Sequence, residues 1–212
     1  MKKELYYVKS LEEDFFTKTL KGKNKVNFQS VYDIIKTKTL KPNTLSFGRK
    51  RRLSTTILNS NYLKTYRPQG IIFQTKETHD YIFPFDLTVL AATKDIIVHY
   101  YRIKNKLHIY YNHSLIPGFE KFIFYDFKKM IKRYPSLKKV WAAVNRFRKK
   151  AGFSELPIQK FRLIEYNEAI FHKPIKIKPI AIFGYRKETA RIAEKLNLPH
   201  YVSAKHFYRS IQ

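Results

Sequence analysis

The sequence predicts an α+β fold in which short strands form mixed sheets and amphipathic helices flank them. Three observations carry this prediction. Residues 161–208 alternate between strand-like and helix-like patterns, residues 95–103 and 106–111 resemble two paired strands, and residues 136–151 have the spacing of an amphipathic helix. The chain has 212 residues and no internal repeat, so we expect a single domain over residues 1–212.

The segment 161–208 is expected to organise the rest of the chain. Aromatic and β-branched residues predict a strand over 161–171, which ends before Pro174. The segment is then predicted to continue with a strand over 175–183, a helix over 187–198 and a short strand over 200–204. Two carboxylates, Glu165 and Glu168, fall in the first strand, and we expect Glu168 near a sheet edge or a cleft.

The other elements follow from local signals. A short strand is predicted at residues 5–8, and a helix over 28–37 with Asn27 as its N-cap. Residues 122–152 form a basic helical segment, with one helix over 122–133 and a second over 136–151. Ser136 should cap the second helix and Gly152 should end it.

The second helix is expected to have one apolar and one basic face. Trp141 is assigned to the core because it lies on the apolar stripe. The opposite face is predicted to carry the cations Lys138, Lys139, Arg146, Arg148, Lys149 and Lys150.

The net charge of +27 is the strongest signal in the composition. There is no acidic residue between Asp33 and Glu77 or between Asp126 and Glu155, whereas Lys and Arg are frequent in both stretches. A nucleic acid is the natural partner for such a chain, because cations that neutralise phosphates release condensed counterions. The alternative is a lysine-rich composition that serves only solubility.

Other classes of protein are disfavoured by composition. The chain has no cysteine, which excludes disulfides, thiol catalysis and cysteine-bound zinc. No stretch reaches the roughly 18 apolar residues of a membrane span, so we expect a cytoplasmic protein without a membrane partner. The glycines are too scattered for a dinucleotide or P-loop phosphate cradle, and no His/Asp/Glu spacing predicts a metal site.

Several segments, taken in order, resemble the DarT-type ADP-ribosyltransferase toxins, which modify nucleic-acid bases using NAD. The resemblance covers about two thirds of the chain and is carried by NFQSVYDIIKTKTL, GRKRRL, THDYIFPF, EYNEAIF and SAKHFY. It implies a single-domain ADP-ribosyltransferase-like fold, in which SAKHFY corresponds to the closing strand and aromatic tail. Residues 9–26 correspond to an insertion, and Tyr7 stands where the family has a histidine.

The resemblance also implies roles for individual residues. Glu168 would be the catalytic glutamate. Arg52, or Arg51 if the register shifts by one, would hold the NAD diphosphate or orient the target, and Arg52 is counted with Glu168 as catalytic. Tyr7 and Tyr81 would line the nicotinamide pocket. Contacts with the nucleic acid are expected from Arg49, Lys50, His79, His113, Arg146 and Lys149.

The implied partners follow from the same resemblance. NAD is expected as a substrate, with no metal. The acceptor would be single-stranded DNA or possibly RNA, and a macrodomain-type antitoxin would neutralise the toxin.

Two other functions compete with this one. The chain could be a non-enzymatic nucleic-acid-binding protein on the same scaffold. It could instead be a metal-independent nuclease, if two of His99, His108 and His113 converge as acid and base. The basic cluster at 49–52 can serve as a solvated face, and Glu168 as an edge-strand acid paired with a nearby Lys or Arg.

Overall fold

The computed structural model describes residues 5–11, 29–42, 44–45, 51–91, 98–103, 106–111, 114–115 and 117–212. Its main sheet is antiparallel except for the β12–β13 pair, and in spatial order its strands are β13 (His200–Tyr201), β12 (Lys178–Phe183), β5 (Gly70–Gln74), β1 (Tyr7–Ser10), β4 (Arg51–Ile57), β10 (Glu168–Phe171) and β6 (Tyr81–Phe83). A short strand, β3 (Thr44–Leu45), adds to β4. The α+β class is therefore confirmed, and the main sheet is mostly antiparallel. The ADP-ribosyltransferase-like fold stays a prediction.

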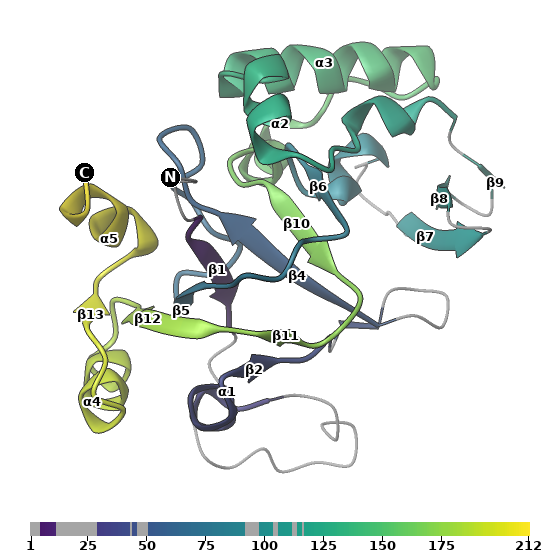
Figure 1. The fold of residues 1–212 in the computed structure, drawn as a ribbon. Coiled ribbons are helices and arrows are strands. Elements are labelled where there is room, and N and C mark those ends of the chain that lie inside the picture. The colour runs from purple at the N-terminus through teal and green to yellow at the C-terminus, as the bar shows by residue number, and fades with distance from the viewer. Residues whose placement is uncertain are drawn as a thin grey trace.

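Two small sheets accompany the main one (Figure 1). One pairs β2 (Thr39–Leu40) with β11 (Ile175–Lys176). The other contains β7 (Val98–Ile103), β8 (Lys106–Tyr111) and β9 (Ser114–Leu115), and its β7–β8 hairpin confirms the two paired strands expected from the sequence.

The helices lie around the main sheet (Figure 1). The α-helices are α1 (Val31–Thr37), α2 (Phe127–Arg133), α3 (Leu137–Lys150), α4 (Lys187–Lys195) and α5 (Ala204–Ser210). In the described part of the chain, the 3-10 helices η2 (Leu87–Ala91), η3 (Phe119–Phe122) and η4 (Ile158–Ile164) connect the sheet with α2 and α3. Within the described ranges, none of the helices combines the length and hydrophobicity that a membrane span requires.

The α3 helix begins and ends where the sequence predicts. The Ser136 hydroxyl accepts a hydrogen bond from the Lys139 amide at the N-terminus, and Gly152 adopts a φ of 79° just past the C-terminus. Trp141 is only half-buried, with its ring 5.2 Å from that of Phe161. The assignment of Arg148 to the basic face is wrong, because its side chain is completely buried.

Buried Arg148 attaches α3 to the rest of the fold. Its Nη1 donates to the Val89 carbonyl in η2 at 3.1 Å, and its Nε donates to the Ser154 carbonyl at 2.9 Å. Apolar residues of α3, η2, η3, β6 and β10 pack in the same core cluster. The helices α2 and α3 therefore pack directly on the main sheet.

The predicted strand over 161–171 is wrong in its first half. Residues 158–164 form η4, and the strand β10 begins only at Glu168. Asn167 explains the boundary: its side-chain Oδ1 accepts from the Ile57 amide at 2.9 Å and its Nδ2 donates to the Ile57 carbonyl at 2.7 Å. The Asn167 side chain thus bonds the Ile57 amide and carbonyl of β4, which a longer β10 would otherwise pair with through its backbone.

The predicted closing strand at SAKHFY is also wrong, because these residues form the start of α5. Ser203 is its N-cap, and the Ser203 hydroxyl accepts from the His206 amide at 3.3 Å. The preceding strand, β13, has only two residues, so the strand predicted over 200–204 is correspondingly shorter.

Two predicted helix starts are displaced toward the C-terminus. The helix expected over 28–37 begins at Val31, because Ser30 and Asp33 form a capping box; Asn27 and Phe28 lie outside the described residues. The helix expected over 122–133 begins at Phe127, where the Asp126 side chain accepts from the Lys129 amide.

The first strand lies slightly later than residues 5–8. It runs over Tyr7–Ser10 and pairs with both β4 and β5. Residues 9 and 10 of the expected insertion therefore belong to the main sheet, and residues 12–26 lie outside the described part of the chain. Gly70 lies opposite Ser10 at this point, and a Cβ atom there would collide with the Lys9 carbonyl.

Candidate functional site

The strand register separates the candidate residues onto the two faces of the main sheet. Residues opposite one another in an antiparallel pair project to the same face, and the face alternates along each strand. Glu168 lies opposite Phe83, and Ile170 lies opposite both Ser54 and Tyr81. One face, here called the Glu168 face, therefore carries Arg52, Ser54, Tyr81 and Glu168.

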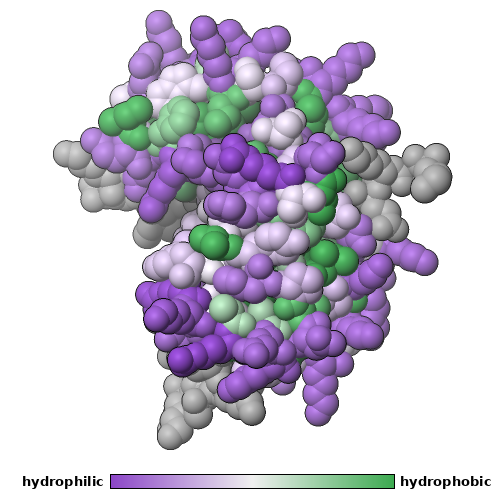
Figure 2. Space-filling model, turned by 90° about the vertical axis from the view of Figure 1, so that its left-hand side faces the viewer, coloured by the Kyte–Doolittle hydropathy of each residue, from purple (hydrophilic) through white to green (hydrophobic). Residues whose placement is uncertain are grey.

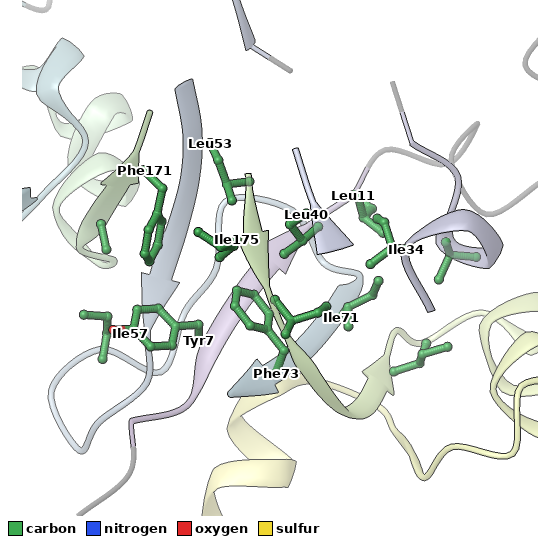
Figure 3. Packing of buried hydrophobic residues seen from close by; sticks show 14 of the residues in the cluster. Tyr7, Leu11, Ile34, Leu40, Leu53, Ile57, Ile71, Phe73, Phe171 and Ile175 are labelled. Carbon is green, nitrogen blue, oxygen red and sulfur yellow. The ribbon is translucent and has the colours of Figure 1, made fainter. Parts of the chain in front are cut away.

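The other face, here called the Tyr7 face, is occupied by the main hydrophobic core. Phe171 lies opposite Leu53 in the β10–β4 pair, and Tyr7 lies opposite Ile57 in the β1–β4 pair and Phe73 in the β1–β5 pair. Figure 3 shows these side chains gathered in one cluster. The resemblance implied that Tyr7 and Glu168 share a pocket, but the sheet lies between their side chains.

The Glu168 carboxylate is buried, with 4% of the residue exposed. The Ser54 hydroxyl donates to Oε1 at 2.8 Å, and the Leu87 backbone amide of η2 donates to Oε2 at 3.4 Å. The Arg52 guanidinium lies 3.4 Å from Oε1 through Nη1. Glu168 is thus held by neighbours from β4 and η2, one strand in from the sheet edge, and is not an exposed edge acid.

Opposing effects act on the pKa of Glu168. Burial raises this pKa most strongly, and the negative charge of Asp86 raises it further. The positive charge of Arg52 and the hydrogen bonds from Ser54 and Leu87 act in the opposite direction. The net result is a carboxyl whose pKa lies above its ordinary range, which makes it a better proton acceptor than an exposed glutamate.

A second acid lies beside Glu168 and connects the site to an exposed ring. The Tyr166 hydroxyl donates to Asp86 Oδ2 at 2.6 Å, and burial followed by the Asp86 charge raises the pKa of Tyr166. The Tyr166 ring lies 6.0 Å from that of Tyr66, which is exposed, and the Arg67 guanidinium lies 4.7 Å above Tyr66. This row of side chains runs from half-buried Asp86, beside buried Glu168, to the surface.

Tyr81 is placed on the same face as Glu168 and belongs to a second polar group. Its hydroxyl lies 3.2 Å from His172 Nε2, and His172 Nδ1 lies 3.1 Å from Asp80 Oδ2. Asp80 also accepts from the His172 backbone amide at 2.8 Å, which fixes the carboxylate against the end of β10. The predicted pair Arg52 and Tyr81 therefore shares a sheet face with Glu168.

Tyr7 has a different environment. Its ring stacks on Phe73 at 5.6 Å and meets the edge of Phe171 at 5.8 Å between ring centroids. Burial raises the pKa of Tyr7 to about 12, so the hydroxyl is neutral. It lies 3.3 Å from His79 Nδ1, and the geometry describes a packing residue with one polar contact.

His79 is half-buried on the Tyr7 side of the sheet. Its Nε2 lies 3.3 Å from the Tyr125 carbonyl. Burial lowers the pKa of His79, while the Tyr125 carbonyl, Asp126 and Asp80 oppose that shift. The expected contact between His79 and a nucleic acid stays a prediction, and Tyr125 beside it is an exposed aromatic residue.

The remaining predicted nucleic-acid contacts are divided between exposed and undescribed residues. Arg146 and Lys149 are exposed on α3. Arg49, Lys50 and His113 lie outside the described residues, and for Arg51 only the backbone, at the start of β4, is described. His99 and His108, the residues of the nuclease alternative, belong to β7 and β8, and only their backbone is described.

Four residues of the site were not identified from the sequence: Ser54, Asp86, Tyr166 and His172. Ser54 follows Arg52 by two positions in a strand, so alternation alone could have placed it on the same face. Asp86 and Tyr166 are distant in sequence and meet only through the fold. Among the residues whose side chains are described, no group of three or more His, Cys, Asp or Glu residues is arranged to hold a metal ion.

Comparisons with known proteins yield no match for this chain among protein-family models, curated proteins or solved structures. The geometry of the Glu168 face is therefore the main structural basis for a functional assignment.

Proposed function

We propose that the protein is a mono-ADP-ribosyltransferase that transfers ADP-ribose from NAD to a nucleobase of DNA, or possibly RNA. The observation that carries the proposal is the buried Glu168 carboxylate beside the Arg52 guanidinium at 3.4 Å, with its pKa raised by burial. The resemblance of GRKRRL and EYNEAIF to the DarT-type toxins assigns the NAD-contacting arginine and catalytic glutamate to these same two residues.

The proposed transfer exchanges one bond to the ribose for another. The bond between the nicotinamide nitrogen and the ribose C1 carbon breaks, and a bond from this carbon to a nitrogen of the base forms. Nicotinamide leaves as a neutral molecule, and the proton of the base nitrogen passes to the Glu168 carboxylate and from there to water. Glu168 also stabilises the positive charge that develops at the ribose carbon.

The other residues of the Glu168 face have supporting roles in this proposal. Arg52 holds a phosphate oxygen of NAD, since a guanidinium presents its donors as a fork that matches phosphate. Ser54 fixes the orientation of the Glu168 carboxylate through its 2.8 Å hydrogen bond. Tyr81 lies on the same face and is assigned to the wall of the nicotinamide pocket, whereas Tyr7 is assigned to the core.

The partners in the proposal follow from charge and from the resemblance. The net charge of +27 supports a nucleic-acid acceptor. By the resemblance, the enzyme acts as a toxin or an anti-phage effector in the cytoplasm, and a macrodomain-type antitoxin is its counterpart.

A non-enzymatic nucleic-acid-binding protein is the second candidate. It is favoured by the contacts of Glu168 itself, because Ser54, Leu87 and Arg52 together form the environment of a structural ion pair. In that function the surface cations bind the nucleic acid, and Glu168 only stabilises the fold.

Labelled NAD separates the two functions. The protein is incubated with NAD and with single-stranded DNA or RNA oligonucleotides, and the oligonucleotide mass is measured. The transferase predicts a mass gain of one ADP-ribose unit that is lost in Glu168→Ala. Glu165→Gln is the matched control, because Glu165 pairs with exposed Lys64 at 2.6 Å, and this variant should keep the activity. Oligonucleotide binding with no label and no loss of NAD would establish the second candidate.

A further inference from the structure

The surface formed by η3, α2 and α3 carries a dense group of cations. Between Asp126 and Glu155 the sequence contains no acid, and the exposed cations of this stretch are Lys128, Lys129, Lys132, Arg133, Lys138, Lys139, Arg146, Lys149 and Lys150. Figure 2 shows hydrophilic side chains projecting from the end of the molecule that carries α3. Three of these cations, Arg133, Arg146 and Lys150, lie near Lys121 of η3.

Lys121 marks the point of convergence. Its Nζ lies 5.1 Å from the centre of the Phe122 ring and 4.9 Å from that of Phe147, so two aromatic faces fix its position. Burial lowers the pKa of Lys121, and the charges of Lys150, Arg146 and Arg133 lower it further. Because the Lys121 ammonium lies over Phe147, three positions before Lys150 on the same helix, the fold brings cations of η3 and α3 close together.

Ring contacts support the same arrangement, because the Tyr134 ring, next to Arg133, stacks on the Phe122 ring at 6.1 Å between centroids. Burial raises the pKa of this tyrosine, and the guanidinium groups of Arg133 and Arg146 both oppose that shift. The two arginines therefore lie near one phenol group, although 13 positions separate them in the sequence. We use the term cation cluster for Lys121, Arg133, Arg146 and Lys150.

The helical spacing explains which cations of α3 join the cluster. Lys139, Arg146 and Lys150 are separated by seven and four positions, so they lie along one stripe of the helix. Lys138 and Lys149 are also exposed but occupy a neighbouring stripe, about 100° around the helix axis. Lys139 shares the stripe but lies about two turns before Arg146. Arg146 and Lys150, which are four positions apart, are the two cations of α3 that act on Lys121.

The position of the cluster is fixed relative to Glu168. Arg148, on the buried side of α3, donates to the Val89 carbonyl of η2, and the Leu87 amide of the same η2 donates to Glu168. The helix that supplies two cations of the cluster and the buried acid are thus attached to one short element. A chain bound at the cluster is held on a support that is rigidly connected to the Glu168 face.

We propose that the cation cluster binds consecutive phosphates of a single nucleic-acid strand, and that it holds the acceptor strand while a base is modified. Four like charges repel one another, and a polyanion relieves this repulsion. The α3 helix, of 14 residues, is about 21 Å long, which spans several phosphates of a strand. The choice of a nucleic acid as the polyanion rests on the proposed function; the presence of an anion-binding cluster does not.

The test measures binding of a fluorescein-labelled single-stranded DNA 20-mer by anisotropy, without NAD, over a series of salt concentrations. The double variant Arg146→Gln/Lys150→Gln is compared with Lys187→Gln/Lys195→Gln, which removes the same charge from two exposed positions of α4. Because each phosphate contact contributes about 0.7 to the salt slope for a single strand, the cluster variant should lose about 1.4 of that slope and bind at least tenfold more weakly. The control variant should keep the slope within about 0.5 of the wild-type value.

Three results would overturn the proposal. One is equal weakening in both double variants, which indicates a diffuse charge effect. The other is unchanged binding in the cluster variant with an unchanged thermal unfolding midpoint. Vesicles of phosphatidylserine are tested beside the DNA, and cluster-dependent binding to vesicles but not to DNA would also contradict it.

Failure of this proposal can be distinguished from failure of the proposed function. Cluster-dependent DNA binding without any transfer of ADP-ribose contradicts the transferase and leaves the cluster intact. Transfer at the wild-type rate by the cluster variant, with DNA binding unchanged, contradicts the cluster and leaves the transferase intact.

Discussion

The two faces of the main sheet differ in how they accommodate polar groups. On the Tyr7 face, the Tyr7 hydroxyl lies among aromatic rings and contacts one histidine nitrogen, and the buried Thr55 hydroxyl donates to the Ala169 carbonyl. On the Glu168 face, a buried carboxylate is surrounded by a guanidinium, a hydroxyl, a backbone amide and a second acid. Buried charges occur in proteins where such partners are supplied. The contrast therefore supports the proposal that any chemistry takes place on the Glu168 face.

The contrast also corrects the simplest form of the family resemblance. Tyr7 stands in the position of the family histidine, yet strand alternation directs its ring away from Glu168. Tyr81 and His172 lie on the Glu168 side and contact each other at 3.2 Å. A tyrosine from β6 is therefore a better candidate for the substrate pocket than the tyrosine from β1.

The largest expected effect on stability concerns the packing of the Tyr7 face. Phe171 is 2% exposed and contacts both Tyr7 and His79. Phe171→Ala should lower the free energy of unfolding by about 3–5 kcal/mol, because it leaves a cavity in the main core. Ile170→Val, on the opposite face of the same strand, should cost about 0.5–1.5 kcal/mol. Chemical denaturation measures both, and a loss below about 1 kcal/mol for Phe171→Ala would contradict its place in the main core.

A smaller effect is expected where α3 attaches to η2. Arg148→Met should cost about 2–4 kcal/mol, because it leaves the Val89 and Ser154 carbonyls without their guanidinium donors. Lys149→Met changes the adjacent, exposed cation and should stay within about 0.5 kcal/mol of the wild type. Thermal unfolding of the two variants provides the comparison. Equal midpoints would mean that Arg148 does not fix α3.

The Tyr7 hydroxyl should contribute less still. Tyr7→Phe removes one contact of 3.3 Å with His79 and keeps the ring stack with Phe73. The expected loss is about 0.5–1.5 kcal/mol, the net value of one hydrogen bond. The nuclear magnetic resonance titration of His79 should shift in the variant, and an unchanged titration would show that the contact is absent in solution.

The pH dependence of stability should report on Glu168. Its folded-state pKa is raised above the ordinary value of 4.5, so the folded protein binds this proton more tightly than the unfolded chain does. The corresponding stability is fully present below pH 4.5, falls as the pH rises through the folded-state pKa, and is constant above it. The unfolding free energy of the wild type minus that of Glu168→Gln should therefore decrease as the pH rises through this window. An increase would mean that Arg52 outweighs burial.

Local patterns in the sequence predicted the elements whose boundaries are set locally. The α3 helix has its N-cap at Ser136 and its stop at Gly152, and the β7–β8 hairpin follows from two adjacent strand-like runs. The prediction for residues 161–171 was wrong because the strand boundary depends on Asn167 bonding to Ile57, 110 positions away in the sequence. The strand prediction for SAKHFY was wrong because it followed the family resemblance, whereas Ser203 is a local N-cap signal for a helix.

The candidate site was predicted in part. The resemblance paired Arg52 with Glu168, and the structure brings them to 3.4 Å. It did not identify Asp86 or Tyr166, since their contact with each other spans 80 positions and depends on where η2 meets η4. Arg148 was assigned to the basic face because helical spacing alone does not reveal that η2 and Ser154 cover its position.

The most direct test of the central claim compares transfer by Glu168→Gln and by Tyr7→Phe in one assay, with NAD in excess and the oligonucleotide mass as the readout. The account predicts that Glu168→Gln lowers the transfer rate by about 10²–10⁴-fold, the usual effect of removing a catalytic acid or base. Tyr7→Phe, on the other face of the sheet, should stay within about threefold of the wild type. Comparable losses in the two variants, or no transfer by the wild-type protein, would contradict the assignment of catalysis to the Glu168 face.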